Sequence, residues 1–405
     1  MLTFHVILAV VGVAALIVRP RSFRSALVSS IAAGVDVALG ARLAPTVTAV
    51  GPLLVFLCAA LTLAALAERS GLAARAAYVL ARAARGSALV LYGLVCTLCT
   101  LLTWVVTLDG SVVLTVPVLL VLARRWAAPF APLFVGVVVV ANAASIAVPQ
   151  GNPTNLVIIQ RLGLSPETFL TRMFAPGLAA TLLCAGVVAL WQRRVLAGGY
   201  RPPELKPEPA PEPEPEPEPG PVVRRALSGA ERGAALWLGA AAVAAWTAPL
   251  VGVAPWWPFA GVVAAAIAVD RTRSGRTRLV VPWRIVVQVG ALVTLLAPLG
   301  LHGSADQVRG LGGLAAVALG VGAASALANN LPVSVWAATL LAGAAGYAAA
   351  IGLAVGSLAA PQGSVATLIA VDLAGSHAPR LRVRQLAPLA TAAVLVASLV
   401  LAASQ

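Results

Sequence analysis

Apolar stretches of helical length recur from one end of the chain to the other, separated by short segments rich in arginine or proline. A stretch of roughly 20 apolar residues is long enough to cross a bilayer as an α-helix. The pattern therefore predicts an all-α polytopic membrane protein. The uninterrupted spans that it predicts cover residues 3–18, 25–39, 46–66, 174–191, 234–250, 257–269, 282–301 and 385–402.

Two longer stretches consist of paired apolar limbs that meet at a polar tip. The limbs of residues 87–123 meet at Thr107–Gly110, and those of residues 311–341 meet at Ala328–Pro332. A basic loop at residues 68–85 precedes the first pair of limbs and two arginines follow it, so both ends belong on one side of the membrane. We therefore expect a re-entrant helical hairpin that opens toward the cytoplasm in the first half of the chain, and a second hairpin in the other half.

Each half also contains one long helix that is interrupted. Residues 131–162 are broken by Pro149–Asn155, and residues 346–373 are broken by Pro361–Ser364. The sequence at the first break is SIAVPQG and the sequence at the second is SLAAPQG, with Ser, Ala, Pro, Gln and Gly in the same places. Matching Pro- and Gly-interrupted helices in two halves indicate the internal repeats of a secondary transporter, with the breaks near the membrane midplane.

The order of these elements predicts two inverted-topology repeats joined by a linker. Residues 1–196 and 226–405 each contain about five complete crossings and one hairpin, and an odd number of crossings inverts the second copy. Residues 197–225 between them are rich in proline and glutamate and hold six of the chain's 14 acidic residues. Such a sequence has no apolar face and favours extended polyproline II, so we expect a solvated cytoplasmic linker.

The positions of the arginines predict the orientation of the protein. Arg19, Arg21 and Arg24 follow the first span, which places the N-terminus outside by the positive-inside rule. Arg380 and Arg384 precede the last span, which places the C-terminus outside as well. We expect a multi-pass protein of the cell membrane, with a bacterial plasma membrane as its site.

The composition narrows the class of protein further. Hydrophobic residues make up 60% of the chain and charged residues 10%, against about 25% charged in soluble domains, and the mean hydropathy is +0.94. The net charge of +14 comes from arginines in short loops, a membrane pattern rather than a nucleic-acid surface. Lys206 is the one lysine, which excludes a P-loop ATPase motif. We expect a transporter and not an enzyme, with no cofactor, no metal site and no nucleic-acid partner.

Asp109, at the tip of the first hairpin, is the candidate coupling residue. An aspartate at the middle of a membrane costs about 2.5–3.5 kcal/mol on insertion scales, so its presence calls for a compensating role. A carboxylate that takes up a proton or a cation would couple transport to an ion gradient. The alternative is that Asp109 caps the second limb, and both roles can hold at once. For Asp36, toward the end of a short span, we expect a structural or interfacial role.

Uncharged polar residues at the four breaks are the candidate substrate-binding groups. Interrupted helices expose backbone dipoles and carbonyl groups at membrane depth, where they can hold a polar solute or an ion. Bare backbone is tolerated there when it lines a cavity or is buried in protein. Helix capping and packing are the alternative for the serines and threonines. The candidates are Thr107, Ser111, Asn152, Thr154, Asn155, Asn329, Asn330, Ser357, Ser364 and Thr367.

Two halves that each carry a polar hairpin tip and then an interrupted helix resemble the ion transporter superfamily. This superfamily includes arsenite efflux permeases and sodium-coupled carriers of dicarboxylates, citrate and sulfate. Asp109–Pro117 is similar to the first hairpin of the arsenite permeases, and Asn329–Pro332 is similar to their second tip. Leu108 stands where those permeases have Asn, and Gly151–Asn155 is more similar to the break of the wider superfamily.

The resemblance implies a secondary carrier, with two alternatives for the substrate. The first is arsenite efflux in exchange for protons, with a cytoplasmic ATPase as a partner. The second is a sodium-coupled carrier of a small carboxylate, such as citrate or a dicarboxylate, or of an inorganic anion. Neutral As(OH)₃ suits a site of hydroxyls, amides and one carboxylate, whereas several helix ends suit an anion. A homodimer remains open as the state of assembly.

Overall fold

The computed structural model describes residues 2–18, 23–41, 44–202, 228–248, 256–273, 279–281 and 310–404, together with positions 253, 283, 287, 290, 291, 294, 295 and 308. Over this part of the chain the regular structure is helical, without β-strands apart from one isolated bridge between Ser87 and Gly199. The all-α fold class is therefore confirmed. Most of the expected linker, from residue 203 on, and most of the expected span at 282–301 lie outside the described residues.

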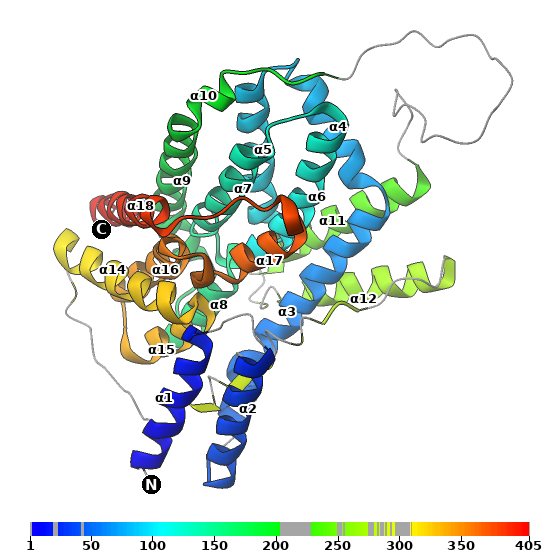
Figure 1. Cartoon of the computed structure of the whole chain (residues 1–405). Coiled ribbons are helices and arrows are strands. Elements are labelled where there is room, and N and C mark those ends of the chain that lie inside the picture. The colour runs from blue at the N-terminus through cyan, green and yellow to red at the C-terminus, as the bar shows by residue number, and fades with distance from the viewer. Residues whose placement is uncertain are drawn as a thin grey trace, which may run out of the picture.

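The helices of the first half follow the predicted order closely (Figure 1). The limbs of the first predicted hairpin are α5 and α6, and the interrupted helix is α7, a 3₁₀ turn and α8. The elements are α1 (Leu2–Val18), α2 (Phe23–Ala38), α3 (Ala44–Arg69), α4 (Leu72–Ala83), α5 (Ala88–Val105), α6 (Leu108–Trp126), α7 (Phe130–Ala144), η1 (Pro149–Gly151), α8 (Pro153–Leu162), α9 (Pro166–Trp191) and α10 (Arg193–Leu196).

The described helices of the second half have the same sequence of types. A hairpin of α14 and α15 precedes an interrupted helix made of α16, two 3₁₀ turns and α17. The elements are α11 (Gly229–Thr247), α12 (Trp256–Arg273), α14 (Gly310–Ala328), α15 (Asn330–Leu340), α16 (Ala344–Ala354), η4 (Gly356–Ala359), η5 (Pro361–Gly363), α17 (Val365–Ala374), η6 (Gly375–His377) and α18 (Val383–Ala403).

Four of the described helices are long and apolar enough to cross a membrane, namely α5, α9, α14 and α18. A fifth span results if Leu54–Ala67 and Leu72–Ala83, which meet at 69°, act as one bent helix. The second member of that pair, α4, lies where the sequence predicts a basic loop. Its alanines Ala77 and Ala81 are buried, while its arginines are not, so the basic segment forms a two-faced helix.

Helix α9 begins at Pro166, eight positions before the predicted start at residue 174. The Ser165 side chain accepts a hydrogen bond from the backbone N–H of Thr168, and proline occupies the first helical position. Both features favour a helix start at this point. The prediction was too short because it followed hydropathy alone, and the first turns of α9 are polar.

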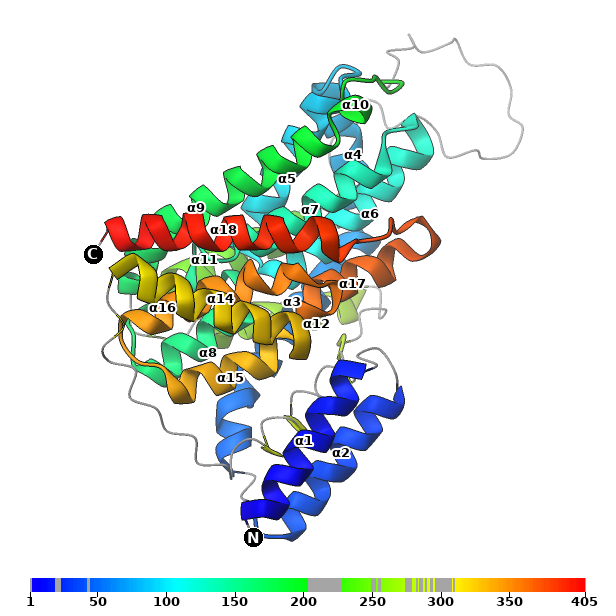
Figure 2. The same cartoon turned by 60° about the vertical axis from the view of Figure 1, so that its left-hand side comes forward.

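Helices α1 and α2 pack along each other as a pair that stands away from the main body (Figures 1 and 2). Their small buried residues contact Ala291 and Leu295. His5 Nδ1 lies 2.5 Å from Asp36 Oδ1, and the Asp36 side chain is fully buried. This contact between the two helices agrees with a structural role for Asp36.

Helices of the two halves interleave in the main body. Helix α6 packs against α17, and α8 packs against α15. Helices α9 and α18, the last long helices of the two halves, lie side by side, with α14 against α18 (Figure 2). The largest buried apolar cluster accordingly contains residues of both halves, such as Leu119, Phe134, Ile351 and Val394. Neither half has a complete core of its own in this arrangement.

Glycines bring the backbones of α14 and α16 into direct contact. A Cβ atom added to Gly356 would lie 2.5 Å from Gly322 Cα, and one added to Gly352 would lie 2.9 Å from Gly322 N. Such distances leave no room for a methyl group on either backbone. Small residues allow this close approach, which increases dispersion contact between helices where no water drives their association.

We predict that Gly352→Ala lowers thermal stability by about 1–3 kcal/mol, because the added methyl group overpacks the α14–α16 contact. Gly320→Ala on α14 is the matched control, since a Cβ there would meet no atom within 4 Å. Alanine is the better helix former by about 1 kcal/mol, so the control should be neutral or stabilising. Heating the detergent-purified variants and measuring the remaining monodisperse fraction would check this. Equal melting of both variants would contradict the packing argument.

Candidate functional site

The first hairpin turns at Thr107, which lies between α5 and α6. Its φ is +134°, a conformation that β-branched residues rarely adopt. Its Oγ1 accepts a hydrogen bond of 3.1 Å from the backbone N–H of Gly110, so Thr107 is the N-cap of α6. Thr107 therefore fixes the tip, and Asp109 follows in the first turn of α6.

The second hairpin turns in the same way at Asn329. Its φ is +77°, and its Oδ1 accepts a hydrogen bond of 3.3 Å from the backbone N–H of Leu331, which makes it the N-cap of α15. Its Nδ2 also donates to the carbonyl oxygen of Gln362 at 2.9 Å. Asn329 thus joins the hairpin tip to the helix break of the same half.

The two helix breaks have nearly the same backbone conformation. The residues before the PQG turns are Val148 (φ −131°, ψ 147°) and Ala360 (φ −137°, ψ 144°). The residues after the turns are Asn152 (φ −135°, ψ 132°) and Ser364 (φ −124°, ψ 132°). The shared sequence motif therefore corresponds to a shared shape.

The last position of each motif requires glycine, because the chain passes too close to itself there for a side chain. A Cβ atom on Gly151 would lie 2.7 Å from the carbonyl oxygen of Ser145, and one on Gly363 would collide with the carbonyl oxygen of Ser357. Ser145 and Ser357 are the first residues of the two copies of the motif. In both halves the chain folds back on itself so that the first and last residues of the motif touch.

Asparagine side chains hold the first break in shape. Asn155 Nδ2 donates to the carbonyl oxygens of Ser145 and Val148, at 2.8 and 3.0 Å. Asn152 Nδ2 lies 3.2 Å from Ser145 Oγ, and Asn152 Oδ1 accepts from the backbone N–H of Thr154 at 3.0 Å. These bonds satisfy backbone groups that the interruption leaves outside the helix hydrogen-bond pattern. Asn152 is therefore a helix cap, and Asn155 keeps its carbonyl oxygen for another partner.

Buried oxygen atoms without a hydrogen-bond partner gather at these breaks. Over the described residues, nine buried side-chain oxygen atoms lack a hydrogen-bond partner. Three of them, in Asp36, Asn142 and Ser398, lie elsewhere, and six lie at the hairpin tips and the helix breaks. A buried polar group without a partner is destabilising, so these oxygens are the candidates for contact with a solute or an ion. The six at the breaks are Asp109 Oδ1, Thr154 Oγ1, Asn155 Oδ1, Asn330 Oδ1, Ser364 Oγ and Thr367 Oγ1.

The remaining predicted site residues have local hydrogen-bond partners. Ser111 Oγ donates to the carbonyl oxygen of Leu108, and Ser357 Oγ donates to that of Ala354. Ser111 and Ser357, like Thr107, Asn152 and Asn329, therefore use their side chains for helix capping or local packing. All predicted site residues are buried except Asn329, which is half-buried.

Packing between the halves pairs the helices that carry the unpartnered groups, which gives two sets. Helix α6, with Asp109 in its first turn, packs against α17, with Ser364 as its N-cap and Thr367 in its first turn. Helix α8, with Thr154 and Asn155, packs against α15, which begins at Asn330. Each set therefore combines groups from both halves of the chain.

Sequence reasoning missed the anchor of the first hairpin tip. The carbonyl oxygen of Trp104, at the end of α5, accepts hydrogen bonds from Gln150 Nε2 at 3.0 Å and from Trp246 Nε1 at 3.1 Å. Trp104 Nε1 in turn donates to the carbonyl oxygen of Ala144 at 3.0 Å. The tip is thus held by the break, by α7 and by α11. The glutamine common to both motifs was the available signal.

A helical membrane protein with buried, unsatisfied polar groups at paired helix breaks has the characteristics of a secondary transporter. The family model of the citrate transporters (CitMHS) matches residues 2–359, and the chain belongs to this family. No individual curated protein matches the sequence at a significant level. The family confirms that the protein is a transporter and supports the predicted relation to ion-coupled citrate carriers; it does not support arsenite efflux.

We predict that Gln150→Leu lowers the rate of transport about 2- to 10-fold, because one hydrogen bond to the tip contributes about 0.5–1.5 kcal/mol. Gln362→Leu is the matched control at the same place in the second motif. The Gln362 side chain makes no hydrogen bond within the described residues, and only its backbone carbonyl is engaged. Initial rates in proteoliposomes of equal protein content would compare the two. A larger loss with Gln362→Leu would contradict the assignment.

Proposed function

We propose that this protein is a secondary active carrier of citrate or a related small carboxylate, driven by a gradient of protons or sodium ions. The observation that carries the proposal is the cluster of six unpartnered buried oxygens at the helix breaks. The family match supports the small-carboxylate alternative over arsenite efflux. The arguments for arsenite were the two hairpin tips, at Asp109–Pro117 and Asn329–Pro332, and the fit of neutral As(OH)₃ to a polar site, and the family match outweighs them.

The site would bind an anion without basic side chains. None of the residues proposed for the site is lysine or arginine. Four helices begin at the breaks, α6, α8, α15 and α17, and each N-terminus presents free N–H groups and a partial positive charge. These ends, with the hydroxyl groups of Thr154, Ser364 and Thr367, would donate hydrogen bonds to the carboxylates of the solute. The amide oxygens of Asn155 and Asn330 only accept, so they would bind a hydroxyl group of the solute or the coupling ion.

Asp109 would bind the coupling ion. Its side chain is 3% exposed, and its Oδ1 has no hydrogen-bond partner. A bare carboxylate at this place would repel an anionic solute and would lack solvation. Uptake of a proton or a sodium ion removes both costs, so solute and coupling ion would bind together. The gradient of the coupling ion would drive transport, so the carrier would need no partner ATPase.

The proposal includes the inverted repeats of residues 1–196 and 226–405. The matching break geometry and the reciprocal packing of α6 on α17 and α15 on α8 support it. Inversion about an axis in the membrane plane would exchange the two pairs of helices. With both termini outside and the linker in the cytoplasm, the two sets of polar groups would face each other near the midplane.

Uptake into proteoliposomes tests the function directly. Citrate, a dicarboxylate, sulfate and arsenite would be supplied one at a time, under an imposed proton gradient or an imposed sodium gradient. We expect accumulation of citrate or the dicarboxylate with one of the two gradients. Accumulation of arsenite alone, or of no carboxylate under either gradient, would refute the proposal.

We predict that Asp109→Asn abolishes gradient-driven accumulation, because the amide cannot bind or release a proton and attracts sodium weakly. Asp372→Asn on α17, where the aspartate is exposed, is the control and should accumulate solute normally. Both variants should insert and purify like the unmodified protein. The ratio of internal to external radiolabelled citrate at steady state is the measurement. Full accumulation by Asp109→Asn would remove Asp109 from the coupling step.

Asn155→Ala and Asn330→Ala should each raise KM about 2- to 10-fold. Each removes an amide oxygen that would accept a hydrogen bond from a hydroxyl group of the solute or bind the coupling ion, and one such bond contributes about 0.5–1.5 kcal/mol. The double variant should lose less than the product of the two effects, since both residues would bind one ligand. A thermodynamic cycle from the four KM values measures this coupling. Independent, multiplicative losses would show that the two asparagines do not share a solute.

A further inference from the structure

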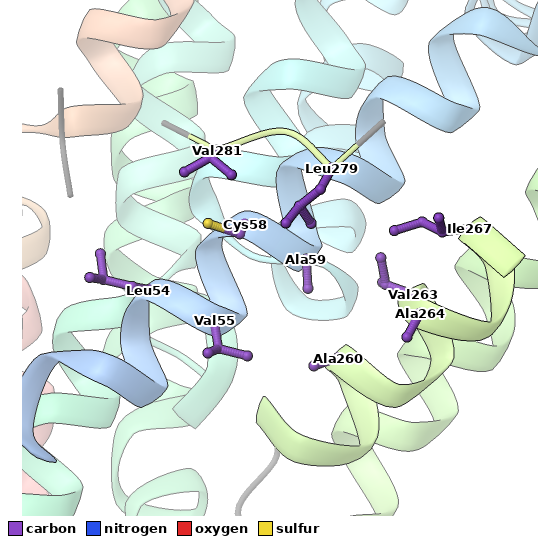
Figure 3. Close-up of a pocket in the computed structure, with 10 residues that line it drawn as sticks. All are labelled: Leu54, Val55, Cys58, Ala59, Ala260, Val263, Ala264, Ile267, Leu279 and Val281. Carbon is purple, nitrogen blue, oxygen red and sulfur yellow. The ribbon is translucent and has the colours of Figure 1, made fainter. Parts of the chain in front are cut away.

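A groove with apolar walls lies between α3 and α12, away from the helix breaks (Figure 3). Its volume is about 320 Å³. Val55 and Ala59 of α3 lie opposite Ala260 and Val263 of α12, and Leu279 and Val281 line a third side. The thiol of Cys58 is the one side-chain heteroatom among the ten lining residues.

The wall that contains Leu279 is tied to α3. The backbone N–H of Val280 donates to Thr62 Oγ1 at 2.9 Å, and Thr62 Oγ1 itself donates to the carbonyl oxygen of Cys58. These bonds hold the segment after α12 across the groove. Three chain segments therefore form the groove, namely α3, α12 and residues 279–281, and they do not enclose it fully.

The chemistry of the walls excludes a polar solute. Small-molecule sites of about 300–1,000 Å³ usually combine apolar walls with a few convergent polar groups that orient the ligand. This groove has no such groups. None of its lining residues belongs to α6, α8, α15 or α17, so it is separate from the transport site. An apolar chain is the ligand that the walls can hold.

The sequence that joins two of the walls is strongly basic. Four arginines lie between Ile267 and Leu279, at positions 271, 273, 276 and 278. Arg271 is exposed in the last turn of α12. Such clusters directly beside a membrane helix attract anionic lipid headgroups, and by the positive-inside rule this cluster faces the cytoplasm.

The dimensions of α12 agree with a lipid that lies along it. Val263 is eight residues from Arg271, which corresponds to about 12 Å along the helix axis. Trp257, near the opposite end of α12, is 59% exposed and is of the type that anchors a helix at the membrane interface. The groove is thus at the depth of acyl chains when the arginines are at the depth of headgroups.

We propose that this groove binds one acyl chain of an anionic phospholipid, whose headgroup lies at the end of α12 beside the exposed Arg271. The concave shape between two helices fits a single chain better than the convex face of a second copy of this protein. The bound lipid would fill the space between α3 and α12 and would stabilise their contact.

The test measures bound lipid and is independent of transport. The full chain is purified in a mild detergent, and native mass spectrometry counts phosphatidylglycerol bound per protein, with phosphatidylcholine as the neutral comparison. Ala264→Trp fills the groove, and Ala265→Trp is the control, since Ala265 is an exposed neighbour on α12 that does not line the groove. We expect the first variant to lose the bound phosphatidylglycerol and the second to retain it.

A second variant tests the headgroup. Arg271→Gln should lower the affinity for phosphatidylglycerol about fivefold, the change expected for one basic residue near an anionic surface, and leave phosphatidylcholine unaffected. Equal binding of both lipids by the unmodified protein would overturn the anionic assignment. Retention of lipid by Ala264→Trp would refute the groove as the lipid-binding site. A change from dimer to monomer in that variant would show that the groove binds a second copy of the protein instead.

Discussion

The structure depends on one constraint, which is that polar groups buried among apolar helices must find partners. Helix interruptions at Pro149 and Pro361 release backbone groups that a continuous helix would satisfy by itself. The chain meets this need at the breaks with side chains such as those of Asn155 and Asn329. The close packing of the two halves follows, because bare backbone is stable at membrane depth only when protein surrounds it.

Polar residues at the breaks divide into two groups by what they already bind. Thr107, Asn152 and Asn329 cap helices and shape the turns, so their loss would disturb the frame. Asp109 and Asn330 keep an oxygen without a partner in a buried position. The first group supports the second, and this arrangement would keep the unsatisfied groups in place for the proposed solute or ion. Preorganisation of this kind reduces the ordering that binding requires.

The two hairpin tips resemble each other in backbone and differ in their anchors. Trp104 at the first tip receives hydrogen bonds from Gln150 and from Trp246 on α11. Asn329 at the second tip makes its own bond to the backbone of Gln362. The same motif therefore uses its glutamine side chain in one half and its glutamine backbone in the other. The first tip is therefore bonded to more elements than the second, and one of them, α11, lies outside both its hairpin and its break.

The sequence by itself determined the fold class, most helix positions, the hairpins and the two breaks, because apolar length and Pro–Gly interruptions are local signals. It also supplied the candidate site residues, whose roles stay predictions. Local signals could not reveal that His5 contacts Asp36 or that Trp246 reaches Trp104. The two-faced pattern of α4 was a local signal, and it was missed because the segment was interpreted by its charge. Only the tertiary structure decided the long-range partners, such as Trp104 for Gln150 and Gln362 for Asn329, because hydropathy carries no record of which distant segments pair.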